Sequence, residues 1–443
     1  MDLLLLLAVL ALPLYWKRPA AGLLLQVFLQ AVIFGGSRDV SLSKVLYAGY
    51  FAVLMLIWMP GFFATLRQTI RVPFAKWLAA MFTLFVVSRV VGISHGLAAV
   101  DWFREVSPLL NYGFAFLGIF AFSREPDLRR YLRWFLLVMF LLSVPAAATW
   151  MWFRGFLSES NAVMSLTNAS PSVFMGGLFL AITLAAEDRQ NLKLYTAAGA
   201  FFVGCMLITG SRMESASAIL GAAIVAFLFW RRGELAASVA FKFATAAALI
   251  AVVAIVALSM SGSIDMGDIA DRFLAATQSD IVEDQTVTNR ITETLDAWEA
   301  FQEGPLVGKG LGYQTGTTYI VGHVPVVIEM YFIHNMYVYL LAKLGAVGFV
   351  VVLGYFASAI RTALRSFFRF RDRPFSGYFA AFVGFTVAIL FESVTANQFA
   401  DRTASSLIGV FSGLLLYLVS GYQNTSDPAS TEANRSNQLS ETA

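Results

Sequence analysis

The sequence predicts an all-α protein, a polytopic transmembrane helical bundle of about 12–13 spans with one long outward loop containing amphipathic helices. Composition is the first observation. Of the 443 residues, 58% are hydrophobic and 13% are charged, whereas soluble domains carry roughly 25% charged residues. Second, the apolar residues form runs close to the roughly 20 residues that a helix needs to cross a bilayer core. Third, Lys and Arg are concentrated in alternate loops, which is typical of a multi-pass membrane protein.

The apolar runs predict the spans in chain order. They cover 2–16, 20–35, 46–66, 74–94, 107–123, 131–153, 170–186, 194–210, 216–230, 238–260, 333–356, 377–395 and 403–421. The first two runs are short, so a bundle of about 12 spans stays an alternative. The run 2–16 is followed, not preceded, by the basic residues Lys17 and Arg18, so we expect a retained span and not a signal peptide. The single cysteine, Cys205, lies in an apolar run and can form no internal disulfide.

The distribution of basic residues predicts the orientation. One set of alternate loops is rich in them and is expected in the cytoplasm: Lys17/Arg18, Arg67/Arg71/Lys76, Arg124/Arg129/Arg130/Arg133, Arg189/Lys193, Arg231/Arg232 and Arg361/Arg365/Arg369/Arg371/Arg373. The other set is poorer and is expected to face outward, to the periplasm of a bacterium with two membranes: Arg38/Lys44, Arg104, Arg154, Arg212 and Arg402. Basic residues interleaved with aromatic ones form no patch, so no nucleic-acid partner is expected.

Residues 261–332 form the one long outward loop, and its acidic residues far outnumber the basic ones. Within it, "NRITETLDAWEAFQ" places Ile291, Leu295, Trp298 and Phe301 on one face at helical spacing. The following "EGPLVGKGLGY" is rich in Gly and ends the helix. We therefore expect an amphipathic helix that lies on the membrane or covers a cavity, followed by a turn-rich segment.

The remaining divisions follow from these spans and this loop. Residues 1–193 and 194–260 are two groups of transmembrane helices before the loop, and 333–422 hold the C-terminal transmembrane helices. The tail 423–443 is rich in Ser, Thr, Asn and Glu, and a segment of that composition is expected to be disordered and cytoplasmic.

Three residues on the outward side are candidates for chemistry: Arg212, Arg290 and His334. Each also has a structural explanation. Arg212 could contact lipid headgroups or cap a helix, Arg290 could pair with Glu293 or Asp284, and His334 could be an interfacial histidine bonded to backbone. Together they suit phosphate recognition with proton abstraction, because a guanidinium holds phosphate oxygens bidentately and a neutral imidazole accepts a proton from a hydroxyl.

Other polar residues are weaker candidates. His323 is a second histidine in the same loop, and His95 also lies outward. Asp265, Asp268 and Asp271 recur at every third residue, which is typical of a solvated helix face and not of a metal site. Fixed arginines can stabilise a leaving diphosphate without a metal, so neither a metal nor a cofactor is expected.

Several motifs together resemble the O-antigen ligase and O-antigen polymerase superfamily of bacterial membrane glycosyltransferases. They are "ITGSRMESASAILGAAIVAFLF", "NRITETLDAWEAFQEGPLVGKGLGYQTG" and "HNMYVYLLAKLGAVGFVVVLGYF". The shared pattern is a Ser-Arg after a helix, an Arg upstream of Trp and a Gly-rich turn, and a His-Asn that opens the next helix. It covers roughly residues 195–356, so 194–260 would open the ligase-like domain. Met213 and Glu214 depart from it, because small residues are commoner after Ser-Arg.

The resemblance implies a role for each candidate residue. Arg212 and Arg290 would bind the diphosphate of an undecaprenyl-linked glycan donor, and His334 would be the general base on the acceptor hydroxyl. Four further residues are expected to bind substrate: Asn335, which could also align the imidazole, Lys309, Tyr313 and His323.

The implied function is transfer of a glycan from an undecaprenyl-diphosphate carrier to an acceptor hydroxyl at the periplasmic face of the bacterial inner membrane, independent of metal and inverting. The acceptor would be lipid A-core or a growing polysaccharide, and other polysaccharide-assembly membrane proteins are further expected partners. A lipid-linked oligosaccharide flippase is the alternative, because transporters also have many spans. A structural scaffold is a third reading, which would leave the two arginines and the histidine without a role.

Overall fold

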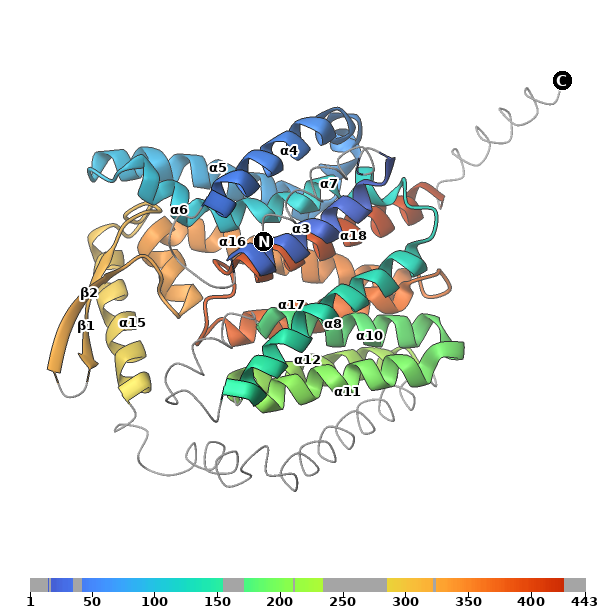
Figure 1. Ribbon diagram of the computed structural model, residues 1–443. Coiled ribbons are helices and arrows are strands. Elements are labelled where there is room, and N and C mark those ends of the chain that lie inside the picture. Colours follow the sequence, from blue (N-terminus) through green and yellow to red (C-terminus); the bar gives the residue numbers. More distant parts are fainter. Residues whose placement is uncertain are drawn as a thin grey trace.

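Long apolar helices run side by side in the computed structural model of the chain (Figure 1), as the apolar runs predict. The structure describes residues 15, 17–34, 42–153, 171–209, 212–233, 285–321 and 324–425. The helices of the bundle are α3 (Pro19–Phe34), α4 (Leu42–Thr69), α5 (Pro73–Ser94), α6 (Ala99–Leu109), α7 (Phe114–Phe122), α8 (Leu128–Phe153), α10 (Pro171–Glu187), α11 (Leu192–Thr209), α12 (Arg212–Arg231), α16 (Met336–Arg369), α17 (Ser376–Glu392) and α18 (Arg402–Thr425). Two short 3₁₀ helices, Leu110–Gly113 and Arg189–Asn191, connect α6 to α7 and α10 to α11.

The predicted all-α membrane fold is confirmed. Six helical stretches of the described residues are long and apolar enough to cross a membrane: Leu46–Thr69, Pro73–Ser94, Ala99–Phe122, Met213–Arg231, Met336–Arg369 and Arg402–Gln423. Three shorter apolar helices pack among them, Pro19–Ile33, Ser172–Glu187 and Ser376–Glu392. The protein is therefore a multi-pass membrane protein, and its total number of spans stays a prediction.

Several predicted features lie outside the described residues. These are most of the run 2–16, the run 238–260, His323, the acidic triplet 265–271, Asp284, the side chain of Arg212 and most of the tail. Helix α18 continues to Thr425, a few residues into the segment predicted as tail. The predicted span 107–123 begins earlier than expected, because α6 and α7 form one apolar stretch from Ala99 to Phe122.

Small residues set the closest approaches between helices. A Cβ atom on Gly118 of α7 would lie 2.3 Å from the Cα of Gly413 of α18, and one on Gly221 of α12 would lie 2.6 Å from the carbonyl oxygen of Gly384 of α17. Glycine at both sides of a contact lets two helix backbones touch, which is how membrane helices gain dispersion energy without a hydrophobic driving force.

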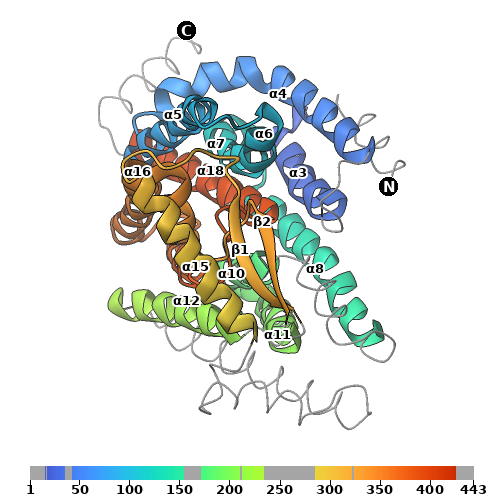
Figure 2. The ribbon, with the colours of Figure 1, turned by 90° about the vertical axis from the view of Figure 1, so that its left-hand side faces the viewer.

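The two ends of the bundle differ as the charge pattern predicts. The links α4–α5, α7–α8, α10–α11 and α16–α17, which carry the arginine-rich loops, lie at one end (Figure 1). Helix α15 (Gln285–Glu303) and strands β1 (Thr315–Val321) and β2 (Val324–Met330) cross the opposite end, in front of the bundle in Figure 2. The predicted helix is therefore present at the end of the bundle that is poor in arginine, and Ile291, Leu295 and Trp298 of its predicted apolar face are exposed.

An antiparallel hairpin follows α15 and the predicted turn-rich segment. Strands β1 and β2 pair from Thr315 with Met330 to Val321 with Val324. The hairpin itself was not predicted, although "TTYIV" and "VPVVI" contain the β-branched and aromatic residues that favour strands. The glycine-rich part, residues 304–313, is the part that turns.

Helix α16 is interrupted at Gly345, which has φ 66° and ψ −173°. The break frees backbone groups on both sides, and the glycine-rich loop 304–313 binds them. The amides of Lys309 and Gly310 donate to the carbonyl oxygens of Ala342 and Lys343, both at 2.9 Å. In return, the amides of Ala346 and Val347 donate to the carbonyl oxygens of Pro305 (2.9 Å) and Leu306 (3.2 Å). The loop thus replaces the missing helical hydrogen bonds, as buried backbone requires in a membrane.

A buried ion pair holds this loop against the rest of the bundle. Lys343 of α16 lies 3.0 Å from Glu105 of α6, and both side chains are buried. Glu105 also accepts a hydrogen bond from the Gly312 amide, and the Lys343 ammonium donates to the Tyr313 carbonyl oxygen. Each charge therefore has a charged and a backbone partner, which offsets part of the cost of removing it from water.

Candidate functional site

His334 lies immediately before helix α16, and its neighbours hold the backbone there. Asn335 is the N-cap: its side-chain oxygen accepts from the amides of Tyr337 (3.0 Å) and Val338 (3.2 Å). The Met336 amide donates to the carbonyl oxygen of Ser393 at the end of α17, at 2.9 Å. Capping satisfies helix amides that have no partner in the helix, so the position of His334 is set by two helices.

Glu293 of α15 binds His334 at two points. One carboxylate oxygen accepts from the His334 backbone amide at 2.9 Å, and the other lies 2.7 Å from the ring nitrogen Nδ1. The Glu293 side chain is 2% exposed, whereas that of His334 is 35% exposed. The ring of Phe332 stands edge-on to the imidazole, with centroids 5.1 Å apart. The imidazole is thus fixed on its Nδ1 side and open elsewhere.

Arg290 lies one helical turn before Glu293 on α15, and its side chain is exposed. Among the described residues, no carboxylate lies within ion-pair distance of it. Glu293 is bonded to His334, so the pairing of Arg290 with Glu293 considered from the sequence is wrong. The exposed guanidinium therefore lies one helical turn from the carboxylate that holds His334.

Helix α12 begins at Arg212, at the same end of the bundle as α15 (Figure 1). The backbone therefore places Arg212 on the predicted side of the molecule. Glu214, in the first turn of the same helix, is buried.

Lys309 and Tyr313 lie in the loop that fills the break in α16. The Lys309 ammonium pairs with Glu303 at the end of α15, and this hydrogen bond lowers the pKa of the Glu303 carboxyl. Along α15, Glu303 is about 15 Å from Glu293. The structure thus links Glu293 to His334, with Arg290 one turn away on α15 and Asn335 next in the chain, and places Lys309 at the far end of α15.

Residues that sequence reasoning missed complete the surroundings of His334. The Tyr331 hydroxyl donates to Asp101 of α6 at 2.8 Å, and the Arg104 guanidinium lies 5.1 Å from the centre of the Tyr331 ring. These contacts tie the segment before His334 to α6. The spacing of residues in the sequence could not reveal these contacts or the contact of Glu293 with His334, because the residues in each pair are far apart in the chain.

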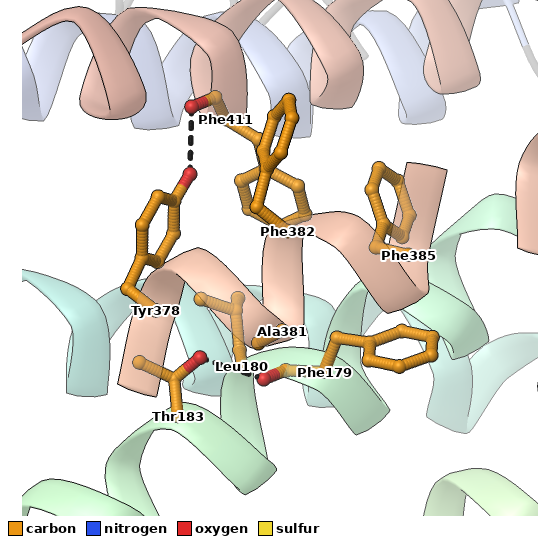
Figure 3. Close-up of a pocket in the computed structure, with 8 residues that line it drawn as sticks. All are labelled: Phe179, Leu180, Thr183, Tyr378, Ala381, Phe382, Phe385 and Phe411. Carbon is orange, nitrogen blue, oxygen red and sulfur yellow. Dashed lines mark hydrogen bonds between the residues drawn. The ribbon is translucent and has the colours of Figure 1, made fainter. Parts of the chain in front are cut away.

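A small apolar pocket lies elsewhere, between α10, α17 and α18 (Figure 3). Its polar groups are already satisfied: the Thr183 hydroxyl donates to the Phe179 carbonyl oxygen at 2.9 Å, and the Tyr378 hydroxyl donates to that of Phe411 at 2.6 Å. The pocket holds none of the predicted site residues. Within the described parts of the chain, His, Cys, Asp and Glu form no group of three or more that could hold a metal ion.

A comparison with known protein families matches part of the chain. The model of the O-antigen ligase family matches residues 197–353, which include Arg212, all of α15, the hairpin and the start of α16. A comparison with curated proteins finds no match. The superfamily resemblance is therefore confirmed: residues 197–353 of this multi-pass membrane protein match the O-antigen ligase family model.

Proposed function

We propose that the protein transfers a glycan from an undecaprenyl-diphosphate carrier to an acceptor hydroxyl at the periplasmic face of the bacterial inner membrane. The observation that carries the proposal is the placement of the exposed Arg290 one turn from Glu293, which holds His334. An exposed cation and a histidine that could accept a proton are thereby linked through Glu293, and both lie within the residues that match the family model.

The proposed reaction assigns each group a step. Arg212 and Arg290 bind the donor diphosphate, and their fixed positive charges stabilise the charge that develops on it. The free ring nitrogen of His334, Nε2, accepts the proton of the acceptor hydroxyl as its oxygen attacks the anomeric carbon. The bond between that carbon and the phosphate oxygen breaks, and its electron pair leaves with the diphosphate. Attack opposite the leaving group inverts the anomeric configuration, and no metal takes part.

The acceptor is proposed to be lipid A-core, which makes the protein a ligase, or a growing polysaccharide, which makes it a polymerase. Asn335, Lys309, Tyr313 and His323 are proposed to bind the two substrates. The bilayer supplies the donor, and other polysaccharide-assembly membrane proteins are proposed neighbours.

One observation favours the alternative of a lipid-linked oligosaccharide flippase. Helix α16 is discontinuous, and discontinuous helices form the substrate sites of many transporters. Here, however, backbone groups of the loop 304–313 occupy the break. The helix ends that bind ions or substrates in transporters are therefore already hydrogen-bonded to the loop. The glycosyltransferase hypothesis, unlike the flippase hypothesis, also gives a role to Arg290 and His334.

The proposal is tested with membranes that carry His334→Ala or Arg290→Ala. They are given undecaprenyl-diphosphate glycan with lipid A-core or polysaccharide acceptors, and product length is followed on gels. We expect both variants to lose transfer by about 100-fold or more, the size of a general-base or charge-stabilisation effect. A ladder of products indicates a polymerase, and a single addition indicates a ligase.

Two variants serve as matched controls. His95→Ala removes an exposed histidine at the end of α5, and Arg365→Ala removes an exposed arginine near the other end of α16. Both are expected to retain transfer. Normal products from the His334 and Arg290 variants at normal expression would exclude the proposed site, and glycan retained inside the cell with transfer intact would favour the flippase.

A further inference from the structure

We infer that Glu293 is the positioning residue of the reaction, fixing the orientation and the tautomer of His334 so that Nε2 is the basic nitrogen that faces substrate. The inference rests on the proposed function, since it specifies how His334 becomes a base. It is carried by the two hydrogen bonds between one carboxylate and one residue.

Hydrogen-bond chemistry decides the tautomer. An ionised carboxylate only accepts hydrogen bonds, so the 2.7 Å contact with Nδ1 requires the proton on Nδ1. A neutral imidazole has one protonated nitrogen, so Nε2 then carries the lone pair. No hydrogen bond joins Nε2 to another described residue, and more than a third of the side chain is open to solvent.

The second contact prevents the pair from rearranging. Because one oxygen of Glu293 is bonded to the His334 backbone amide at 2.9 Å, the carboxylate cannot swing away from the ring without breaking that bond. The same residue thus fixes the backbone and the ring of His334. The Asn335 side chain accepts from the amides of Tyr337 and Val338, and the Ser393 carbonyl oxygen accepts from the Met336 amide, so the imidazole is attached to a helix start whose amides are bonded.

Charge provides a further reason for a carboxylate at this place. Burying a carboxylate is costly unless it is paired, and Glu293 is almost fully buried with His334 as its partner. Arg290, the nearest cation along the helix, is exposed. When Nε2 takes the proton of the acceptor hydroxyl, the imidazolium that forms lies directly against this negative charge, which stabilises it as in other carboxylate–histidine pairs.

The variant Glu293→Gln separates this role from simple packing, because glutamine has nearly the same shape. Glutamine has one acceptor oxygen and one donor amide group. The His334 backbone amide always donates, so the glutamine oxygen must stay there and its amide group must face Nδ1. Nδ1 then has to accept, which moves the ring proton to Nε2 and removes the base without emptying the site.

The first measurement needs no substrate. The purified full chain in detergent is treated with diethyl pyrocarbonate, which modifies unprotonated imidazole nitrogens, and modification is followed at each histidine by mass spectrometry. We expect the rate at His334 to fall about tenfold or more in Glu293→Gln, while His95 is unchanged. The matched control Glu299→Gln, an exposed glutamate of the same helix, is expected to leave both rates unchanged.

The second measurement is transfer from an undecaprenyl-diphosphate glycan. We expect Glu293→Gln to lower kcat by about 100- to 10,000-fold, as in catalysts given the wrong tautomer, with the donor KM within about threefold. Glu293→Asp keeps the charge and should recover part of kcat. The double variant Glu293→Gln/His334→Ala should be no slower than His334→Ala, because both changes remove the same base.

The outcomes distinguish the inference from the proposed function. If folded Glu293→Gln protein is modified at His334 as fast as the unchanged protein, or keeps its kcat, the inference is wrong and His334 can still be the base. If His334→Ala retains transfer, the proposed function fails, and the modification rates still decide whether Glu293 sets the tautomer.

Discussion

Asn335 shows how a residue next to the site contributes without touching the imidazole. The family resemblance suggested that it aligns His334, but its side-chain oxygen caps α16, and Glu293 holds the ring. Its influence on His334 passes through the helix that it starts. A change at Asn335 should therefore act first on stability.

We expect Asn335→Ala to lower the free energy of unfolding by about 1 kcal/mol, the usual loss for a capping side chain. Thermal unfolding in detergent, followed by tryptophan fluorescence, measures the change. Asn335→Asp keeps an acceptor at the helix N-terminus and should stay close to the unchanged protein. Equal losses from both substitutions would show that the cap does not stabilise α16.

The interruption of α16 is the main feature at the scale of single elements. Gly345 adopts a backbone conformation open almost only to glycine. A Cβ atom there would lie 2.3 Å from the backbone carbon of Leu306. The loop 304–313 and the two halves of α16 are therefore one unit, and Gly345 is the residue on which their fit depends.

Gly345→Ala is expected to destabilise the protein by more than the roughly 1–3 kcal/mol of backbone strain, because the loop must also move. Gly49→Ala is the matched control, since Gly49 lies in helix α4 with open space around its Cα. That substitution should be neutral or stabilising. Thermal unfolding compares the two, and an unchanged midpoint for Gly345→Ala would contradict the tight fit of the loop.

How much of this could be predicted differs from element to element. The transmembrane helices follow from apolar runs, because the bilayer imposes their length and composition. The break at Gly345 could not be predicted, because "LAKLGAVGF" is an unbroken helical pattern and the conformation of Gly345 depends on a distant loop. The hairpin had a local signal in its β-branched residues, which the neighbouring glycines obscured.

The candidate site was predictable only in part, because some of its contacts join residues that are distant in the chain. Arg290 and His334 were noticeable as scarce charged or ionisable residues on the outward side of an apolar chain. Glu293 lies in an acidic loop where any carboxylate resembles a solvated one, and its partner is distant in sequence. Only the fold shows that Glu293 is buried.

At the scale of the whole molecule, the helices before residue 194 and the matched domain are packed into one body. Helix α5 packs along α16 of the matched domain, and α7 packs along α18, which follows that domain in the chain. The buried pair of Glu105 and Lys343 joins these two parts beside the loop 304–313. The five-part division predicted from the sequence therefore marks stretches of chain, and the packing crosses its boundaries.

We expect Lys343→Met to destabilise the protein by about 3–5 kcal/mol, because it leaves the Glu105 carboxylate buried without a cation. The double variant Glu105→Gln/Lys343→Met should recover much of the loss, since neither charge remains. The yield of monodisperse protein in detergent measures the effect. Lys76→Met, at an exposed lysine of α5, should be neutral, and equal yields for the two single variants would contradict the coupling.

The break in α16 also separates the part of the helix that crosses the bilayer from the part that holds His334. From Ala346 to Arg369, α16 is about 36 Å long, which already exceeds a hydrocarbon core of about 30 Å. The turns before Gly345 are thus not needed to cross the bilayer, and the loop, α15 and α17 fix them instead. When bilayer thickness changes, a spanning helix adapts by tilting. We expect residues 346–369 to tilt relative to the first turns of α16, with Gly345 as the point of bending. The His334 imidazole should then keep its depth in the membrane and its hydrogen bond to Glu293.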